Sequence, residues 1–222
     1  MLVNPNYKAG GGSPTPSSGY VEDIMAYYDG TDKSLKVTVT NEELIATDSG
    51  GKEYGYVLNS SDGATIEAYI RMDGASSSIY SRAFSVNDVS FCVAFANGGG
   101  SSDSNYHYNP LIMRWGGSLD YDIYPNGLKY GDKHTFSIVS TPDPNEQDAN
   151  TVTFFVDGEQ VGEEKTMSRG SSVTINRFIV EGSTERPLNG ELLNGRFYTR
   201  ALTAAELVAN HANDVAKYGG ND

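Results

Sequence analysis

Residues 190–219 read GELLNGRFYTRALTAAELVANHANDVAKYG, and this stretch decides the fold class. A strand over Glu191–Thr199 is followed at once by a helix with both of its ends marked. Thr203 and Glu206 have the spacing of a capping box, in which each side chain bonds the other residue's backbone N–H. Gly219 is placed to end the helix in a left-handed conformation. The chain is therefore predicted to close with a strand and then a helix.

The helix is predicted to be amphipathic. Leu202, just before the cap, can pack on Leu207 in the first turn. The face toward the rest of the protein is predicted from side chains that recur at helical spacing: Leu207, Val208, His211, Val215 and Tyr218.

Upstream of this stretch the chain reads as a series of short strands. Thr65–Met72 alternates, which predicts a half-buried strand. Val89–Ala96 is apolar or small on both faces and is predicted to be a central strand, with Cys92 as a buried structural thiol. Asp157-Gly158 after Thr151–Val156 predicts a hairpin with a type I′ turn. Further strands are expected at 21–30, 35–40, 79–86, 111–115, 119–124, 134–140 and 173–181.

Composition supports one large β domain. The chain has 222 residues, 38% of them hydrophobic, with 25 glycines and 15 tyrosines, which suits many short strands joined by tight turns. Residues 1–19 are rich in Gly, Ser and Pro and are predicted to form a flexible arm or linker. The remaining residues, 20–222, are predicted to form a single domain.

Several of these segments resemble one family in the same order along the chain. Residues 190–206 resemble the pattern G-x-x-x-x-x-R-x-Y-x-R-A-L-[ST]-x-x-E, and VEDIMAYYDG at 21–30 resembles a typical first strand. FFVDGEQV at 154–161 resembles the family's hairpin. The chain thus resembles a laminin G-like (LamG-like) domain of the concanavalin A-like lectin/glucanase superfamily. The resemblance implies an all-β fold: an antiparallel β-sandwich jelly roll with a short C-terminal α-helix.

The charge balance bears on partners. Sixteen basic residues against 29 acidic ones give a net charge of −13. Such a surface repels phosphate backbones and anionic headgroups, so we expect neither nucleic acid nor a membrane as a partner. The N-terminus shows no secretory signal and no later segment could span a bilayer. Lectin-like sandwiches usually work outside cells, so either this sequence is a trimmed mature form or the protein leaves its cell by another route. We favour the second alternative and expect a virion or extracellular surface location, with release of a phage particle by lysis as the route.

Catalysis is not predicted. Glucanases of the family carry E-x-D-x-x-E on one strand, because a nucleophile and an acid must lie about 5 Å apart. Asp120 and Asp122 share a strand face but lack the third carboxylate. The histidines form no triad with a serine motif, and His134 and His211 are interpreted as packing residues. A glucanase-type glycoside hydrolase remains the least favoured alternative.

No cofactor and no metal ligand are predicted. Calcium stays open as an alternative, because Asp103–Asn109 and Asp120–Asp122 offer the oxygen ligands that it prefers. The sequence has no EF-hand pattern.

Ligand binding is predicted at aromatic residues in polar loops. Sugars stack their C–H faces on aromatic rings and bond Asp and Asn through hydroxyls. The predicted ligand-binding residues are Tyr106, Tyr108, Trp115, Asp120 and Tyr121, against the alternative that these tyrosines and the tryptophan simply pack within the fold.

The predicted function is a non-catalytic, surface-displayed lectin-like domain. It would be a phage virion decoration or adhesion protein that contacts host or mucosal glycans. Other virion proteins would be partners through the arm at residues 1–19. The alternative is a purely structural virion accessory with no ligand.

Overall fold

The computed structural model describes residues 19–22, 24–37, 42–45, 56–58, 63–74, 80–87, 91–96, 111–113, 121–123, 128–146, 149–168, 173–175, 178–180 and 188–221. The predicted arm at residues 1–19 lies outside this part except for Gly19.

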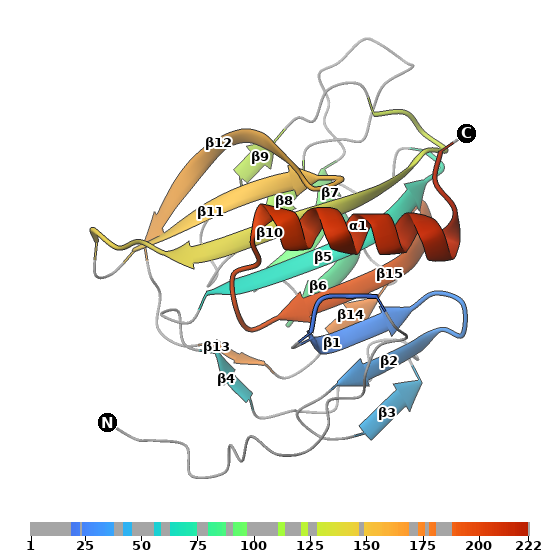
Figure 1. Ribbon diagram of the computed structural model, residues 1–222, viewed down its shortest axis with the longest axis horizontal. Helices are drawn as coiled ribbons and strands as arrows, with labels where there is room; N and C mark the ends of the chain where they lie inside the picture. Colours follow the sequence, from blue (N-terminus) through green and yellow to red (C-terminus); the bar gives the residue numbers. More distant parts are fainter. Residues whose placement is uncertain are drawn as a thin grey trace.

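The described residues form three layers (Figure 1). Helix α1 (Ala204–Tyr218) lies across one face of a large sheet, and a smaller sheet packs on the other face. Every strand pairing in the described part is antiparallel. The predicted antiparallel β-sandwich with a short C-terminal helix is confirmed.

The large sheet has, among the described residues, eight strands in the order β12-β11-β10-β5-β15-β1-β2-β3. The bounds are β1 Ile24–Asp29, β2 Ser34–Val37, β3 Glu42–Ile45, β5 Ala64–Met72, β10 Lys133–Pro142, β11 Ala149–Val156, β12 Glu159–Ser168 and β15 Gly190–Tyr198.

The smaller sheet has, in the same described part, five strands in the order β14-β6-β7-β8-β9. Its bounds are β6 Tyr80–Val86, β7 Phe91–Ala96, β8 Leu111–Met113, β9 Tyr121–Ile123 and β14 Phe178–Val180. β4 (Tyr56–Leu58) and β13 (Val173–Ile175) pair separately.

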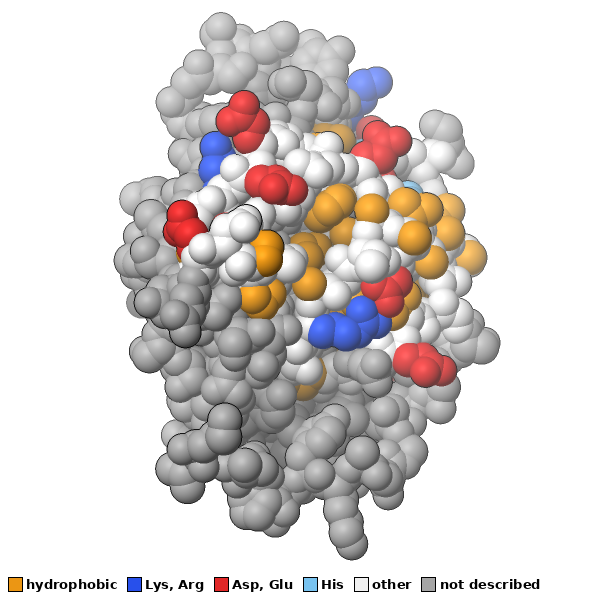
Figure 2. All heavy atoms as spheres, turned by 60° about the vertical axis from the view of Figure 1, so that its left-hand side comes forward, with side chains coloured by type: hydrophobic (Ala, Val, Ile, Leu, Met, Phe, Trp, Pro, Cys, Tyr) orange, Lys and Arg blue, Asp and Glu red, His pale blue; other side chains and the backbone are white. Residues whose placement is uncertain are grey.

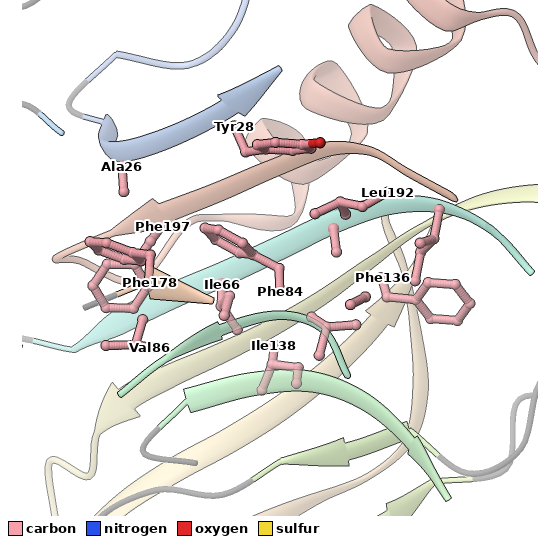
Figure 3. Close-up of a cluster of buried hydrophobic side chains, with 14 of the residues drawn as sticks. Ala26, Tyr28, Ile66, Phe84, Val86, Phe136, Ile138, Phe178, Leu192 and Phe197 are labelled. Carbon is pink, nitrogen blue, oxygen red and sulfur yellow. The ribbon is translucent and has the colours of Figure 1, made fainter. Parts of the chain in front are cut away.

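Aromatic rings from both sheets meet in the core between them (Figure 3). Phe84 and Phe178 belong to the smaller sheet, and Phe197 belongs to the large sheet. The centroid of the Phe178 ring lies 5.9 Å from that of Phe84 and 5.9 Å from that of Phe197. A Cβ at Gly195 would come within 3.0 Å of the Phe84 ring, so glycine leaves the space that this ring needs. Burial of these apolar side chains is the main force that holds the two sheets together.

The local predictions agree closely with the structure. Asp157 and Gly158 have φ of 54° and 83°, as the type I′ hairpin between β11 and β12 requires. Cys92 is a buried free cysteine in β7, a strand with neighbours on both sides.

The strand predicted at 173–181 is instead two strands, β13 and β14, which join different sheets.

The half-buried reading of Thr65–Met72 is wrong. The apolar face of β5 packs in the core as predicted, but Thr65, Glu67 and Tyr69 on the other face are also fully buried. Helix α1 covers them, which alternation along one strand cannot reveal.

The ends of α1 are as predicted, but its buried face is not. Thr203 and Glu206 form the capping box, and Gly219 ends the helix with φ 79°. Leu202 and Leu207 belong to one buried cluster. The buried positions are Leu207, Asn210 and Asp214, whereas Val208 is 50% exposed. The helix therefore docks largely through polar side chains.

The N-terminal cap of α1 should make stability pH-dependent through Glu206. Hydrogen bonds from Arg200 outweigh partial burial and lower the pKa of Glu206 from 4.5 to about 2. A lowered pKa stabilises the fold above pH 4.5, and this contribution is lost as the pH falls toward 2. At pH 7, Glu206→Gln should lower the free energy of unfolding by about 0.5–1 kcal/mol in urea titrations.

Glu159→Gln, at an exposed position of β12, is the matched control and should change the free energy of unfolding little at any pH. An effect of Glu206→Gln that is as large at pH 2 as at pH 7 would contradict this account of the cap.

Candidate functional site

Polar side chains fill the interface between α1 and the large sheet. We call six of them the Arg196 cluster: Tyr20, Glu67, Asn194, Arg196, Asn210 and Asp214. All except Tyr20 have 0% exposure. They come from β5, β15, α1 and the residues just before β1, so the cluster joins four parts of the chain.

Arg196 lies at the centre of this cluster. Its Nη1 and Nη2 donate to Asp214 Oδ1 and Oδ2 over 2.5 and 2.7 Å, and its Nε donates to Glu67 Oε2 over 2.9 Å. Two parallel bonds to one carboxylate fix both the distance and the orientation of the partners. The guanidinium therefore fixes α1 to β5 and β15 at one position.

Asp214 accepts further hydrogen bonds besides those of Arg196. The hydroxyls of Tyr20 and Thr135 donate to it over 3.0 and 2.9 Å, and Asn194 Nδ2 donates over 3.2 Å. With Arg196, five donor atoms surround this carboxylate. Such a set stabilises a buried negative charge.

Glu67 has fewer donors. Besides Arg196, Asn210 Nδ2 donates over 2.7 Å and Ser137 Oγ lies 3.0 Å away. Burial raises the pKa of Glu67, and the Arg196 charge lowers it without cancelling that effect. Desolvation thus dominates the electrostatics of this carboxyl.

Local sequence explains how the cluster is assembled. Glu67 and Arg196 are direct antiparallel partners in β5 and β15, so their side chains leave the sheet on one face. Asn210 and Asp214 are four residues apart on α1 and share a face with Leu207. Docking that face on the sheet brings the helix carboxylate onto the guanidinium.

Two histidines lie at the margin of the cluster. His134 Nδ1 is 2.6 Å from Asp157 Oδ2, and His211 Nδ1 is 3.3 Å from Asp157 Oδ1. His211 Nδ1 is also 2.9 Å from the Thr135 hydroxyl. They were predicted as packing residues. His134 is buried as that predicts, but both make polar contacts. His134 joins β10 to Asp157 in the β11–β12 turn, and His211 joins α1 to the same carboxylate.

The last turn of α1 is held on β1 by a second polar group. Lys217 Nζ lies 2.5 Å from Asp29 Oδ2 and 3.0 Å from the Tyr27 hydroxyl, and Tyr218 donates to Asp29 over 2.9 Å. Burial raises the pKa of Asp29, but hydrogen bonds from Lys217, the Thr31 backbone and Tyr218 outweigh burial and lower it. Polar contacts therefore fix both the middle of the helix and its last turn to the sheet.

The Arg196 cluster cannot perform carbohydrate hydrolysis as it stands. It brings two carboxylates, Glu67 and Asp214, onto one cation, but both are fully buried beneath α1. A glycosidase needs its two carboxyls on either side of a bound sugar. Among the described residues, no group of three or more His, Cys, Asp or Glu is arranged to hold a metal ion. No helix in that part of the chain has the length and apolar character needed to cross a membrane.

Most of the predicted ligand-binding residues lie outside the described part of the chain: Tyr106, Tyr108, Trp115 and Asp120. Tyr121 is the first residue of β9, where its backbone pairs with Met113 of β8. Its side chain is not among those described.

The topology divides these residues into two groups. β8 and β9 are antiparallel neighbours, so residues 114–120 connect their adjacent ends. Trp115, Asp120 and Tyr121 thus belong to one connection and the strand that follows it. Tyr106 and Tyr108 come before β8 in the sequence, ahead of Leu111 at its other end.

Residues 29–208 match the family described as the concanavalin A-like lectin/glucanases superfamily. A comparison with curated protein sequences finds no match.

Solved structures share the fold at low sequence identity. Trypanosoma rangeli sialidase is 11% identical with a TM-score of 0.56, over 95% of this chain and 36% of the sialidase. Domain 4 of AbnA, an extracellular arabinanase of Geobacillus stearothermophilus, was solved with arabinotriose. It is 13% identical with a TM-score of 0.52, over 85% of this chain and 98% of that domain. The chain therefore spans about a third of the sialidase but nearly all of the arabinanase domain.

The Arg196 cluster predicts a large penalty for removing its cation. Arg196→Met would leave two carboxylates buried without a counter-ion, so the free energy of unfolding should fall by about 3–5 kcal/mol. The measurement is urea unfolding of the full chain at pH 7. Adding Glu67→Gln and Asp214→Asn to Arg196→Met should recover part of the loss, because no carboxyl group is then buried without its cation.

Arg71→Met is the matched control. Arg71 pairs with Asp73 and Glu191 in a partly exposed position, where an ion pair contributes up to about 1 kcal/mol. Equal losses for the two arginine variants would show that the buried charges do not govern the docking of α1.

Proposed function

Because the chain belongs to the concanavalin A-like lectin/glucanase superfamily, we propose that it is a non-catalytic lectin-like module that binds glycans. The observation that carries this proposal is the closed face of the large sheet. Helix α1 covers that face, and the carboxylates beneath it have 0% exposure and are occupied by Arg196. Contact with a ligand is then left to the smaller sheet and its connecting loops.

The arabinanase domain supports a carbohydrate as the ligand. That structure holds arabinotriose and matches this chain over nearly its whole length. At 13% identity, this likeness supports the fold alone and does not identify the residues that contact sugar. The proposed contact residues are therefore those on the connections around β8 and β9, where aromatic rings alternate with Asp, Asn, Gly and Ser.

Trp115 and Asp120 are the proposed principal contacts, because one short connection carries both and leads directly into Tyr121. An indole ring offers the apolar surface on which a sugar stacks, and a neighbouring carboxylate accepts bonds from its hydroxyls. Tyr106 and Tyr108 would extend the site from the other end of β8.

The setting that we propose is the surface of a particle such as a phage virion, with residues 1–19 as the attachment. The acidic net charge supports solubility and a partner that is not anionic.

Glycan binding can be tested with the full chain on a glycan array, followed by titration calorimetry with arabino-oligosaccharides and the best array ligands. Trp115→Ala should weaken binding at least tenfold, because a stacked aromatic contact is lost. The double variant Tyr106→Ala/Tyr108→Ala should weaken it less. Incubation with the same glycans should release no reducing ends.

Val208→Ala is the control for this experiment, since Val208 is exposed on α1, on the far side of the large sheet. No retention on any glycan would defeat the proposal. Release of reducing ends that Asp120→Asn abolishes would establish the glucanase alternative.

The attachment role of the arm predicts that removing residues 1–18 leaves both the urea midpoint and glycan affinity unchanged. The reason is that the contacts of the described fold begin at Gly19, whose carbonyl accepts a bond from Asn213, and at Tyr20. Incorporation of the truncated chain into particles should be lost. Incorporation at the natural level would show that the arm is not the attachment.

A further inference from the structure

At the interface between α1 and the large sheet, the charges of Arg196, Glu67 and Asp214 do not balance when all three groups are ionised. Arg196 contributes one positive charge, and Glu67 and Asp214 contribute one negative charge each. All three side chains have 0% exposure. A net negative charge in such a place costs free energy, because water cannot solvate it. Binding of one proton by one of the two carboxylates would remove the imbalance.

The hydrogen bonds show which carboxylate can take the proton. Asp214 receives five donors, including both terminal nitrogens of Arg196, and each of them stabilises the ionised form. Glu67 receives a single bond from Arg196, at its Oε2 atom. Asp214 is therefore the better site for the remaining negative charge.

Glu67 also has a place for the proton. Its Oε1 atom lies 3.0 Å from Ser137 Oγ, and a hydroxyl can either donate or accept. A protonated Glu67 would donate from Oε1 to Ser137. Its Oε2 atom would continue to accept from Arg196 and Asn210. Protonation thus leaves every bond of this carboxyl in place.

We propose that the docking of α1 on the large sheet is proton-linked, with one proton held by Glu67 between Ser137 and Arg196. The direction of its pKa agrees, since burial raises it above the ordinary value of 4.5. Glu67 is thereby a neutral hydrogen-bonding group in the folded protein over a pH range in which it is ionised in the unfolded chain.

Other titratable groups surround Glu67 and must be separated from it. β15 contributes Arg196 and Tyr198, α1 contributes Asp214, and Tyr20 precedes β1. Burial raises the pKa of both tyrosines, so they stay neutral near pH 7. His211 reaches the cluster only through Thr135, and Asp157 and His134 lie beyond it.

The sign of the effect follows from the raised pKa. The folded protein binds more protons than the unfolded chain between pH 4.5 and the pKa of Glu67 in the fold. Stability contributed by this proton is present below pH 4.5 and falls as the pH rises through that window. The ratio of folded to unfolded protein should fall by up to tenfold per pH unit for one proton.

The experiment compares the natural chain with Glu67→Gln by urea unfolding from pH 4.5 to 9. Glutamine has nearly the shape of a protonated glutamate, so it can donate to Ser137 and accept from Arg196. The natural chain should lose stability relative to Glu67→Gln as the pH rises, by up to tenfold per unit, until the difference levels off. Curves that stay parallel across this range would overturn the proposal.

His211→Gln is the control, and it should leave the pH-dependent difference in place. Disappearance of the difference in that background would assign the proton to His211 and overturn the proposal. If Glu67→Gln fails to fold, carbon NMR of glutamate carboxyls in the natural chain decides. One carboxyl that titrates above pH 4.5 supports the proposal, and titration of all of them at or below 4.5 overturns it.

Discussion

A guanidinium buried between a carboxylate of β5 and a carboxylate of α1 governs how the helix sits on the large sheet. Arg196 bonds Asp214 through two nitrogens and Glu67 through a third, and none of the three side chains is exposed. An apolar helix face can slide or rotate at small cost, since hydrophobic contact has no direction. A two-nitrogen bond to one carboxylate allows a single arrangement. The polar interface thus fixes the register of α1, which Leu207 alone would leave open.

This arrangement separates the part of the molecule that holds the fold together from the part available for contact. The core between the sheets depends on Phe84, Phe178 and Phe197, and the second interface depends on the Arg196 cluster. Both interfaces involve the large sheet. The connections around β8 and β9 belong to the smaller sheet, at its edge. Under the proposed function, substitutions in those connections would alter glycan binding and leave the buried charges in place.

Sequence reasoning succeeded where the signal is local. The capping box of Thr203 and Glu206 and the turn at Asp157-Gly158 each depend on residues within a few positions, and both formed as predicted. It failed for the helix face and for the outer face of β5. Hydrophobicity placed Val208 inside, yet Asn210 and Asp214 are the buried positions. Their partners include distant residues, since Glu67 is 143 residues from Asn210 and Tyr20 is 194 residues from Asp214. A charged residue at a strand position gives no sign of whether a helix will cover it.

The candidate ligand residues also show what the sequence alone does not predict. Composition identified polar segments rich in aromatic residues, but the pairing of β8 with β9 decides which of them can meet. Trp115 and Asp120 share the connection between these strands, whereas Tyr106 and Tyr108 approach β8 from its other end. The sequence already assigns the four to two segments, and the antiparallel pairing of β8 with β9 adds that the second segment links these two strands while the first leads into β8.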